Sequence, residues 1–214
     1  IIVMNTEEKF WKKTWEEKYP LVEVHHLTKE EFDHGATRRR GAELSDAEIL
    51  VFMTQDALPA DRKLIGSLVT AIQENEKVGA AYARQLPKSD CGFLEKYTRS
   101  FNYPSESCLK TEKDLATRGI KTYFCSNVCA AYDHKIYNEI GGFPEHAIFN
   151  EDMIYAGWMV KKGYGVAYVA EARVYHSHNY SCAQQFHRNF DLGVSQAEHP
   201  EIFEGVPSEG EGIR

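Results

Sequence analysis

The chain has 214 residues, of which 43% are hydrophobic and 27% are charged, and its formal net charge is -7 at pH 7. This length suffices for one domain with a sizeable buried core. The acidic balance argues against a nucleic-acid partner, which normally requires a basic face. No apolar run approaches the roughly 18 residues that span a membrane, so a soluble cytoplasmic protein is expected. The five cysteines lack CxxC spacing, which indicates reduced thiols rather than a zinc site or a disulfide framework.

Apolar strands alternate with helices along the first part of the chain. The predicted strands are Ile1–Asn5, Leu21–Leu27, Glu48–Met53 and Val78–Arg84, and the predicted helices are Glu7–Tyr19, Ala36–Ser45 and Arg62–Asn75. Such alternation is typical of an α/β fold with a largely parallel central sheet flanked by helices.

Beyond Arg84 the alternation weakens. The stretch Pro87–Gly119 is long, polar and weakly periodic, and we interpret it as an insertion that carries binding residues or a lid. The elements predicted after it are a strand within Tyr123–Tyr132, a helix over His134–Ile140 ended by Gly141-Gly142, a helix from Asn150 to near Gly163, two short strands at Gly165–Val169 and Arg173–His176, and a helix over Ser181–Gly193. We expect one domain over residues 1–214, with a mobile tail at 205–214.

The first candidate site is Thr54-Gln55-Asp56, directly after the predicted strand Glu48–Met53. Ligands of open α/β sheets bind beyond the carboxyl ends of the strands. A carboxylate at Asp56 is therefore suited to a divalent cation that bridges a diphosphate. A turn or helix-capping aspartate before Pro59 explains the same residue equally well.

The second candidate is the acid pair Glu151-Asp152, in the first turn of a helix for which Asn150 is the expected N-cap. Acids are common there because they complement the helix dipole. The functional alternative makes one carboxylate a general base that deprotonates an attacking hydroxyl. The dipole is expected to lower the pKa of that carboxylate.

The third candidate is the pair His176 and His178. On a strand their side chains point the same way, and imidazole suits Mn²⁺ and other transition ions. A lone histidine is more often structural, but two at this spacing favour a metal site.

Basic and amide groups form the fourth candidate. Consecutive helical residues point about 100° apart, so Arg38, Arg39 and Arg40 cannot all face one ligand. Gln185 and Arg188 lie three residues apart on one helix face, where Arg188 can grip a phosphate or an acceptor oxygen. An ordinary surface arginine is the alternative.

Together these stretches resemble the family 2 glycosyltransferases, specifically their bacterial rhamnosyltransferase-like branch. The resemblance covers most of the chain, in order. The segments that carry it are EFDHGATRRRGAEL (Glu31–Leu44), ILVFMTQDALPAD (Ile49–Asp61), VGAAYARQLP (Val78–Pro87), FCSNVCAAY (Phe124–Tyr132), GGFPEHAIFNEDM (Gly141–Met153) and VYHSHNYSCAQQFHR (Val174–Arg188). It implies a GT-A fold in which residues 1–86 bind the nucleotide sugar and residues 87–204 bind the acceptor and carry catalysis.

The resemblance also implies roles for the candidate metal and base residues. Asp56 matches the surviving metal-binding acid of the DXD motif, and Thr54 stands where the first Asp often is. His176 or His178 matches a late metal-binding histidine. Asp152, with Glu151 beside it, matches the catalytic base.

The remaining matches concern the donor and the acceptor. Those on the donor side are His34, Gly35 and Arg38 in the donor-nucleotide loop, joined by Thr54, Gln55 and Asp56. Asn127 falls in the acceptor-side strand. Gln185 and Arg188 resemble a variant of the QxxRW motif with Asn189 in place of Trp.

The implied activity is an inverting, metal-dependent transfer, with Mn²⁺ or Mg²⁺, of a sugar such as rhamnose from a nucleoside-diphosphate sugar to a saccharide or lipid-linked acceptor. Cytoplasmic work at the inner face of the membrane is expected, and peripheral membrane association and a homodimer stay open. Ile1–Asn5 resembles the second strand of the family, so the first strand is expected to be missing. Two alternatives remain: a non-catalytic relative that binds nucleotide sugars, and a metal-dependent phosphohydrolase that cleaves them.

Overall fold

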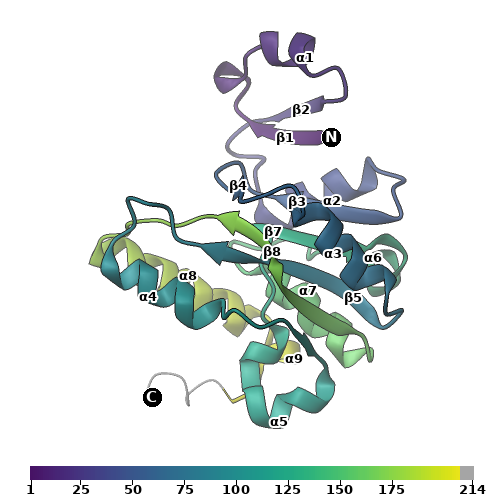
Figure 1. The fold of residues 1–214 in the computed structure, drawn as a ribbon, viewed down its shortest axis with the longest axis vertical. Helices are drawn as coiled ribbons and strands as arrows, with labels where there is room; N and C mark the ends of the chain where they lie inside the picture. Colours follow the sequence, from purple (N-terminus) through teal and green to yellow (C-terminus); the bar gives the residue numbers. More distant parts are fainter. Residues whose placement is uncertain (208–214) are drawn as a thin grey trace.

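The computed structural model of the chain describes residues 1–207 (Figure 1). Its centre is a six-stranded mixed sheet in the order β3-β7-β5-β8-β4, with β6 also paired to β8. The strands are β3 (Ile49–Met53), β4 (Leu58–Pro59), β5 (Val78–Leu86), β6 (Cys108–Lys110), β7 (Cys129–Asp133) and β8 (Gly165–Tyr175).

The three strands that lead to the candidate site run in the same direction. β5 pairs with β8 in parallel, and β7 lies antiparallel between β3 and β5. β3, β5 and β8 therefore point their carboxyl ends toward one edge of the sheet. The short strands β4 and β6 pair antiparallel with β8.

Alternating side chains of the central strands pack into two cores. Ala80 and Tyr82 of β5 join the larger cluster, which also contains Tyr132, Phe143 and Tyr155. That cluster includes side chains of α6 (His134–Ile140) and α7 (Glu151–Lys161). Ala81 and Ala83 of β5 join the second cluster, to which α3 (Leu64–Gln73) contributes Leu64, Leu68 and Ile72. Because successive strand residues point to opposite faces, the two clusters lie on opposite sides of the sheet.

A separate parallel pair, β1 (Ile2–Thr6) and β2 (Glu23–Leu27), stands at one end of the molecule, at the top of Figure 1. The continuous helix predicted over Glu7–Tyr19 is wrong. A 3-10 turn at Glu8–Phe10 ends at an extended Trp11, and α1 covers Thr14–Lys18 alone. Trp11 packs edge-on against Trp15, with ring centroids 5.1 Å apart. The two tryptophans therefore form a local aromatic contact and do not mark one face of a continuous helix.

The predicted polar insertion Pro87–Gly119 is instead built of regular elements. It contains α4 (Phe93–Asn102), β6, a 3-10 turn at Glu112–Asp114 and α5 (Leu115–Arg118). Phe93, Tyr97 and Phe101 of α4 repeat every four residues, so the amphipathic pattern of this helix was present in the sequence and was overlooked. In the structure this apolar side faces solvent: Phe93 is 81% exposed and Tyr97 62% exposed.

Three further predictions need correction. The two short strands at Gly165–Val169 and Arg173–His176 are one strand, β8, whose register against β5 shifts after Ala83. The helix predicted from Ser181 extends further, as α8 (Cys182–Glu198), and α9 (Pro200–Phe203) follows it. Within the predicted tail, the carbonyl of Pro207 accepts a hydrogen bond from Ile120 N, whereas residues 208–214 lie outside the described part.

Between residues 1 and 207, no helix combines the length and the apolar composition that crossing a membrane demands.

Candidate active site

Asp56 and two histidines meet at the edge of the sheet where β3 and β8 end. Asp56 Oδ2 lies 3.4 Å from His176 Nε2 and 3.2 Å from His178 Nε2. The two Nε2 atoms are 3.1 Å apart, and the three ligand atoms all lie within 4.8 Å of one another. The metal ligands predicted from the sequence are thus brought together in one cluster.

The protonation of this cluster favours metal binding. Burial lowers the pKa of His176 to about 4 and also lowers the pKa of His178, although the charge of Asp56 opposes both shifts. Partial burial raises the pKa of Asp56, but the Thr54 side chain and the two histidines outweigh it, so the net shift is downward. At neutral pH the cluster therefore offers an ionised carboxylate and two neutral imidazoles, which are the forms that bind metals.

The spacing of the cluster also fits a divalent ion. An octahedral ion with bonds of about 2.1 Å holds neighbouring ligands about 3.0 Å apart, close to the observed 3.1 to 3.4 Å. Thr54 Oγ1 is buried near Asp56 and helps to lower the pKa of that carboxyl. Two imidazoles with one carboxylate suit Mn²⁺ better than Mg²⁺, which prefers oxygen ligands.

The acid pair at the start of α7 is held by Asn127. Asn127 N donates to Asp152 Oδ2 at 2.9 Å, and Asn127 Nδ2 donates to Glu151 Oε1 at 2.9 Å. Asn127 Oδ1 in turn accepts from Tyr132 Oη at 2.8 Å. Glu151 also forms an ion pair with Arg38 at 3.2 Å. These contacts indicate that Asn127, predicted to lie on the acceptor side, orients both acids.

The carboxylates of Glu151 and Asp152 differ in burial and in how fully their neighbours engage them. Glu151 is buried, with 4% of its surface exposed, and is engaged by Arg38 and Asn127, whereas Asp152 is half-buried. Desolvation first, and the nearby charge of Glu151 second, raise the pKa of Asp152 to about 7. The expected lowering by the helix dipole is therefore wrong, because loss of hydration outweighs it. Asp152 is the acid suited to act as a general base near neutral pH.

Asn150 precedes α7 as predicted but does not cap it through its side chain. Its backbone is left-handed, with φ of 70°, and its buried Nδ2 lacks a hydrogen-bond partner within residues 1–207. The helix start was correct and the expected side-chain cap was wrong.

The predicted donor loop forms the start of α2 (His34–Glu43). Asp33 caps this helix by accepting from Gly35 N at 2.7 Å and Ala36 N at 2.9 Å, and its carboxylate also accepts from Ala147 N. A Cβ on Gly35 would lie 2.2 Å from the carbonyl oxygen of Pro144. Gly35 is thus required by the close approach of α2 to the loop before α7.

The three arginines of α2 diverge, as their spacing predicted. Arg38 Nη1 donates to the carbonyl of His34 at 3.0 Å and faces Glu151. Arg39 donates to the carbonyl of Phe143, and Arg40 is exposed. Arg38 and His34 therefore lie at the acid pair.

The two residues of the predicted amide and basic motif on α8 have different surroundings. The Arg188 guanidinium lies 4.8 Å from the Phe149 ring centroid and 4.9 Å from that of Tyr180. Tyr180 stacks on His178 with ring centroids 5.0 Å apart. Arg188 therefore contacts the group of Asp56, His176 and His178, called here the metal cluster, through the Tyr180 ring. Gln185 is exposed and donates to Asn189. Gln55, beside Asp56, is also exposed.

Sequence reasoning missed Gln85, Arg99 and Glu95, which lie directly behind the histidines. Gln85 is 2% exposed and its Oε1 contacts both His176 Nδ1 and Arg99. A polar amide in the otherwise apolar strand Val78–Leu86 was an available signal. Arg99 and Glu95 belong to α4, which was not recognised as a helix.

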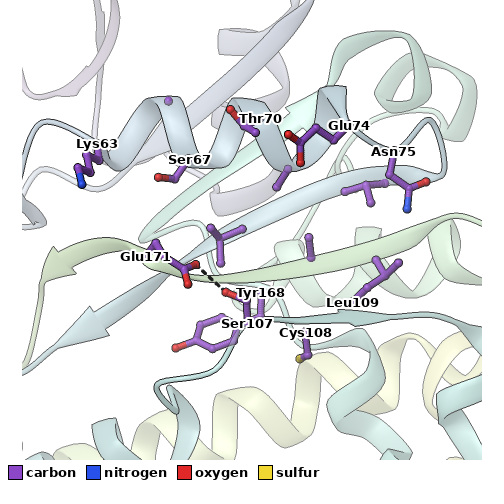
Figure 2. A pocket seen from close by; sticks show the side chains of 15 residues that line it. Lys63, Ser67, Thr70, Glu74, Asn75, Ser107, Cys108, Leu109, Tyr168 and Glu171 are labelled. Carbon is purple, nitrogen blue, oxygen red and sulfur yellow. Dashed lines mark hydrogen bonds between the residues drawn. The ribbon is translucent and has the colours of Figure 1, made fainter.

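A cavity of about 850 Å³ opens elsewhere, between α3 and the strands β6 and β8 (Figure 2). Ser67 and Thr70 of α3, with Glu74 just after it, line one side. On the other side Ser107 donates to Glu171 at 2.7 Å. Its lining includes neither the metal cluster nor the acid pair. The candidate site is therefore identified by its chemistry rather than by cavity size.

The chain is similar in sequence to known glycosyltransferases. The model of glycosyl transferase family 2 matches residues 9–141, more than half of the chain. The O-antigen chain rhamnosyltransferase RfbN of Salmonella typhimurium is 42% identical over 193 residues, which cover 88% of this chain and 61% of that protein. The O-antigen chain rhamnosyltransferase WbaN of Salmonella anatum is 41% identical over 188 residues, covering 86% of this chain and 59% of that protein. The chain thus spans about three fifths of the length of these relatives.

Solved structures share the fold at low sequence identity. The mannosyltransferase PcManGT from Pyrobaculum calidifontis, in complex with GDP-Man and Mn²⁺, matches with a TM-score of 0.65 and 16% identity, over 96% of this chain and 56% of that chain. S. aureus TarS 1–349 matches with a TM-score of 0.60 and 14% identity, over 99% of this chain and 58% of that chain. The fold is GT-A, as the sequence resemblance implied. Given the family model and two relatives at 41 to 42% identity, the chain belongs to glycosyl transferase family 2.

Proposed function

We propose that this chain is the catalytic part of a metal-dependent, inverting glycosyltransferase that uses a nucleoside-diphosphate sugar. The observation that carries the proposal is the pairing of a metal-ligand cluster, Asp56 with His176 and His178, with a general base, Asp152. Gln85 links the two parts: its Oε1 contacts His176, and its Nε2 donates to Ser126 Oγ at 2.9 Å, next to the residue that holds Asp152. The description of the relatives as rhamnosyltransferases supports rhamnose as the transferred sugar.

Each residue of the site has a distinct task in this reaction. A divalent ion at the cluster, when bound, supplies positive charge that stabilises the departing nucleoside diphosphate. Asp152 accepts the proton of the acceptor hydroxyl as that oxygen attacks the anomeric carbon. Asn127 and Arg38 keep the acid pair in place, so the base is oriented before the acceptor arrives. A single displacement from the face opposite the leaving group inverts the configuration.

For the acceptor, we propose a saccharide linked to a lipid and presented at the inner face of the membrane. The support is the outer α4 face, formed by Phe93, Leu94, Tyr97 and Phe101, which are 49% to 81% exposed. Glu95 and Arg99 of the same helix turn inward toward the histidines. A helix with its apolar side outward and its polar side toward the site is suited to lie at a membrane interface.

Product analysis tests the proposal. The purified chain is incubated with deoxythymidine-diphosphate rhamnose or uridine-diphosphate sugars and Mn²⁺, with and without a lipid-linked saccharide, and products are identified by mass spectrometry. We expect a glycosylated acceptor with inverted configuration, produced only when acceptor is present. Release of free sugar independent of acceptor would instead show a phosphohydrolase. Binding of the nucleotide without any product would show a non-catalytic relative.

Two variants separate binding from transfer. Asp56→Ala is expected to abolish Mn²⁺-dependent binding of the nucleoside diphosphate, measured by calorimetry. Asp152→Asn is expected to keep that binding and to reduce transfer by about 10² to 10⁴-fold, the usual contribution of a general base. Glu76→Gln, an exposed acid in the turn after α3, serves as control. Equal loss of binding in both site variants would contradict the assigned roles.

A further inference from the structure

We propose that Arg99 and Gln85 are positioning residues that set the tautomer of His176 and thereby prepare its Nε2 atom to bind a metal. The inference rests on the proposed metal-dependent function, because it concerns the same cluster. Both residues, Gln85 on β5 and Arg99 on α4, lie outside the set of predicted metal ligands and were given no role in the sequence analysis.

Arg99 determines the orientation of the Gln85 amide. A guanidinium has hydrogen-bond donors and no acceptor, so the atom of Gln85 that Arg99 Nη1 contacts must be the oxygen, Oε1. Nε2 of the same amide then faces Tyr103 Oη at 2.5 Å and Ser126 Oγ at 2.9 Å, both able to accept. Arg99 therefore fixes which end of the buried amide faces the histidine.

The same oxygen fixes the proton of His176. Gln85 Oε1 lies 2.9 Å from His176 Nδ1, and because a carbonyl oxygen can only accept, Nδ1 must carry the hydrogen. In a neutral imidazole the other nitrogen, Nε2, then keeps its lone pair. That lone pair is directed to the cluster, where Nε2 lies 3.4 Å from Asp56 and 3.1 Å from His178.

Burial and an ion pair make the arrangement rigid. Gln85 is 2% exposed and His176 is 7% exposed, so water does not readily replace either partner. Glu95 holds Arg99 in an ion pair at 2.5 Å, with both side chains largely buried. Partners of this kind, which hold the non-ligating nitrogen of a metal-binding histidine, typically contribute 10- to 100-fold to metal affinity.

Two variants interrupt the series of contacts from Arg99 through Gln85 to His176 at different points. Gln85→Met keeps the length of the side chain and removes the acceptor. Arg99→Met leaves Gln85 intact but allows its amide to turn, so that the NH₂ group faces Nδ1 and favours hydrogen on Nε2. We expect both to lower Mn²⁺ affinity by about 10- to 100-fold in calorimetry. Gln85→Glu, which keeps the acceptor, and Arg99→Lys, which keeps a donor, are expected to retain affinity within a few-fold.

The tautomer of His176 distinguishes a positioning role of Gln85 and Arg99 from a merely structural one, which would leave the tautomer unchanged. Long-range ¹H–¹⁵N spectra of the metal-free chain, assigned through His176→Gln, should show hydrogen on Nδ1 in the wild type and on Nε2 in Arg99→Met. Gln73→Met, at an exposed position on α3, is the control for mutating glutamine. Thermal unfolding establishes that each variant is folded. If a methionine variant does not fold, the tautomer and the Mn²⁺ affinity of Gln85→Glu and Arg99→Lys are compared with those of the wild type instead.

The outcomes separate this inference from the proposed function. A wild-type chain that binds no Mn²⁺ overturns the metal-dependent function and this inference with it. A wild-type chain that binds Mn²⁺, with equally tight binding by Gln85→Met and Arg99→Met, overturns the inference alone. Hydrogen on Nε2 of wild-type His176 also overturns it. Reduced affinity in the methionine variants and retention in the conservative ones supports it.

Discussion

Asp152 is a carboxylate whose surroundings oppose its charge. Desolvation and the charge of Glu151 raise its pKa to about 7, although it accepts a hydrogen bond from Asn127 N. A pKa near the working pH is what a general base requires, since a more acidic group would be too weak to take a proton. The environments of the two acids therefore suit different roles: support of the site for Glu151 and proton transfer for Asp152.

This environment predicts the pH dependence of transfer. Asp152 is protonated and inactive as a base below its raised pKa, so kcat/KM should fall about tenfold per pH unit below about pH 6 and level off above about pH 8. Transfer is measured from pH 5 to 9 with Mn²⁺ saturating at every point. A profile that stays flat down to pH 5 would contradict a base of raised pKa.

At the scale of elements, α2 is joined to the loop before α7 through one carboxylate. Asp33 accepts from two amides of its own helix and from Ala147 N, 114 residues away. The cap therefore stabilises a tertiary junction as well as a helix, and it places Arg38 beside Glu151.

We expect Asp33→Ala to lower the free energy of unfolding by about 2 kcal/mol, the upper end for an N-cap. Ser181→Ala removes a similar but exposed cap from α8 and should cost about 1 kcal/mol or less. Urea unfolding of both variants gives the comparison. Equal losses would show that the contact with Ala147 adds nothing.

The outer α4 face leads to a prediction about membranes. Changing Phe93 and Tyr97 together to Ser should abolish co-sedimentation with phosphatidylethanolamine–phosphatidylglycerol vesicles, because the interfacial apolar surface is lost. Folding should be little affected, since both side chains are exposed. Ile65→Ser, at a 46% exposed apolar position on α3, is the matched control. Undiminished vesicle binding by the double variant would exclude this face as the membrane contact.

At the scale of the whole molecule, the metal cluster joins segments far apart in the chain. Asp56 and the histidines follow β3 and β8, which are separated in the sheet by β7 and β5. An ion bound there would join these two segments, which lie close together only in the folded state. Its binding free energy is consequently added to the stability of the chain.

Mn²⁺ at about 100 times its dissociation constant should stabilise the chain by about 2.7 kcal/mol. For a chain of this size that corresponds to a rise in Tm of roughly 5 to 11 °C. The rise should disappear in Asp56→Ala and persist in Asp61→Ala, whose carboxylate pairs with Arg173 instead. Differential scanning calorimetry with and without Mn²⁺ measures these shifts in Tm. An equal rise in the Tm of Asp56→Ala would show that the ion binds elsewhere.

Much of this molecule was predictable from local pattern. The apolar run before Asp56, the glycine pair after α6 and the acids at the start of α7 each identified an element because their neighbours in sequence are also their neighbours in space. The roles of Asp56, Asp152, His176 and His178 came from the family resemblance rather than from local pattern, which left alternatives open, and these roles stay predictions. α4 was overlooked although Phe93, Tyr97 and Phe101 repeat every four residues, and only the structure shows that this apolar side faces solvent. The pKa of Asp152 was misjudged because desolvation depends on distant residues.

The sequence by itself determined the α/β class, the family resemblance and the residue types available for metal binding and proton transfer, since these depend on composition and short-range spacing. Only the tertiary structure decided which groups serve together. It brought Asp56 within 3.4 Å of two histidines, placed Asn127 on the acid pair and turned Arg99 toward Gln85. The reason is physical: burial and contact are properties of three-dimensional packing, and they set the pKa values and tautomers on which the proposed chemistry depends.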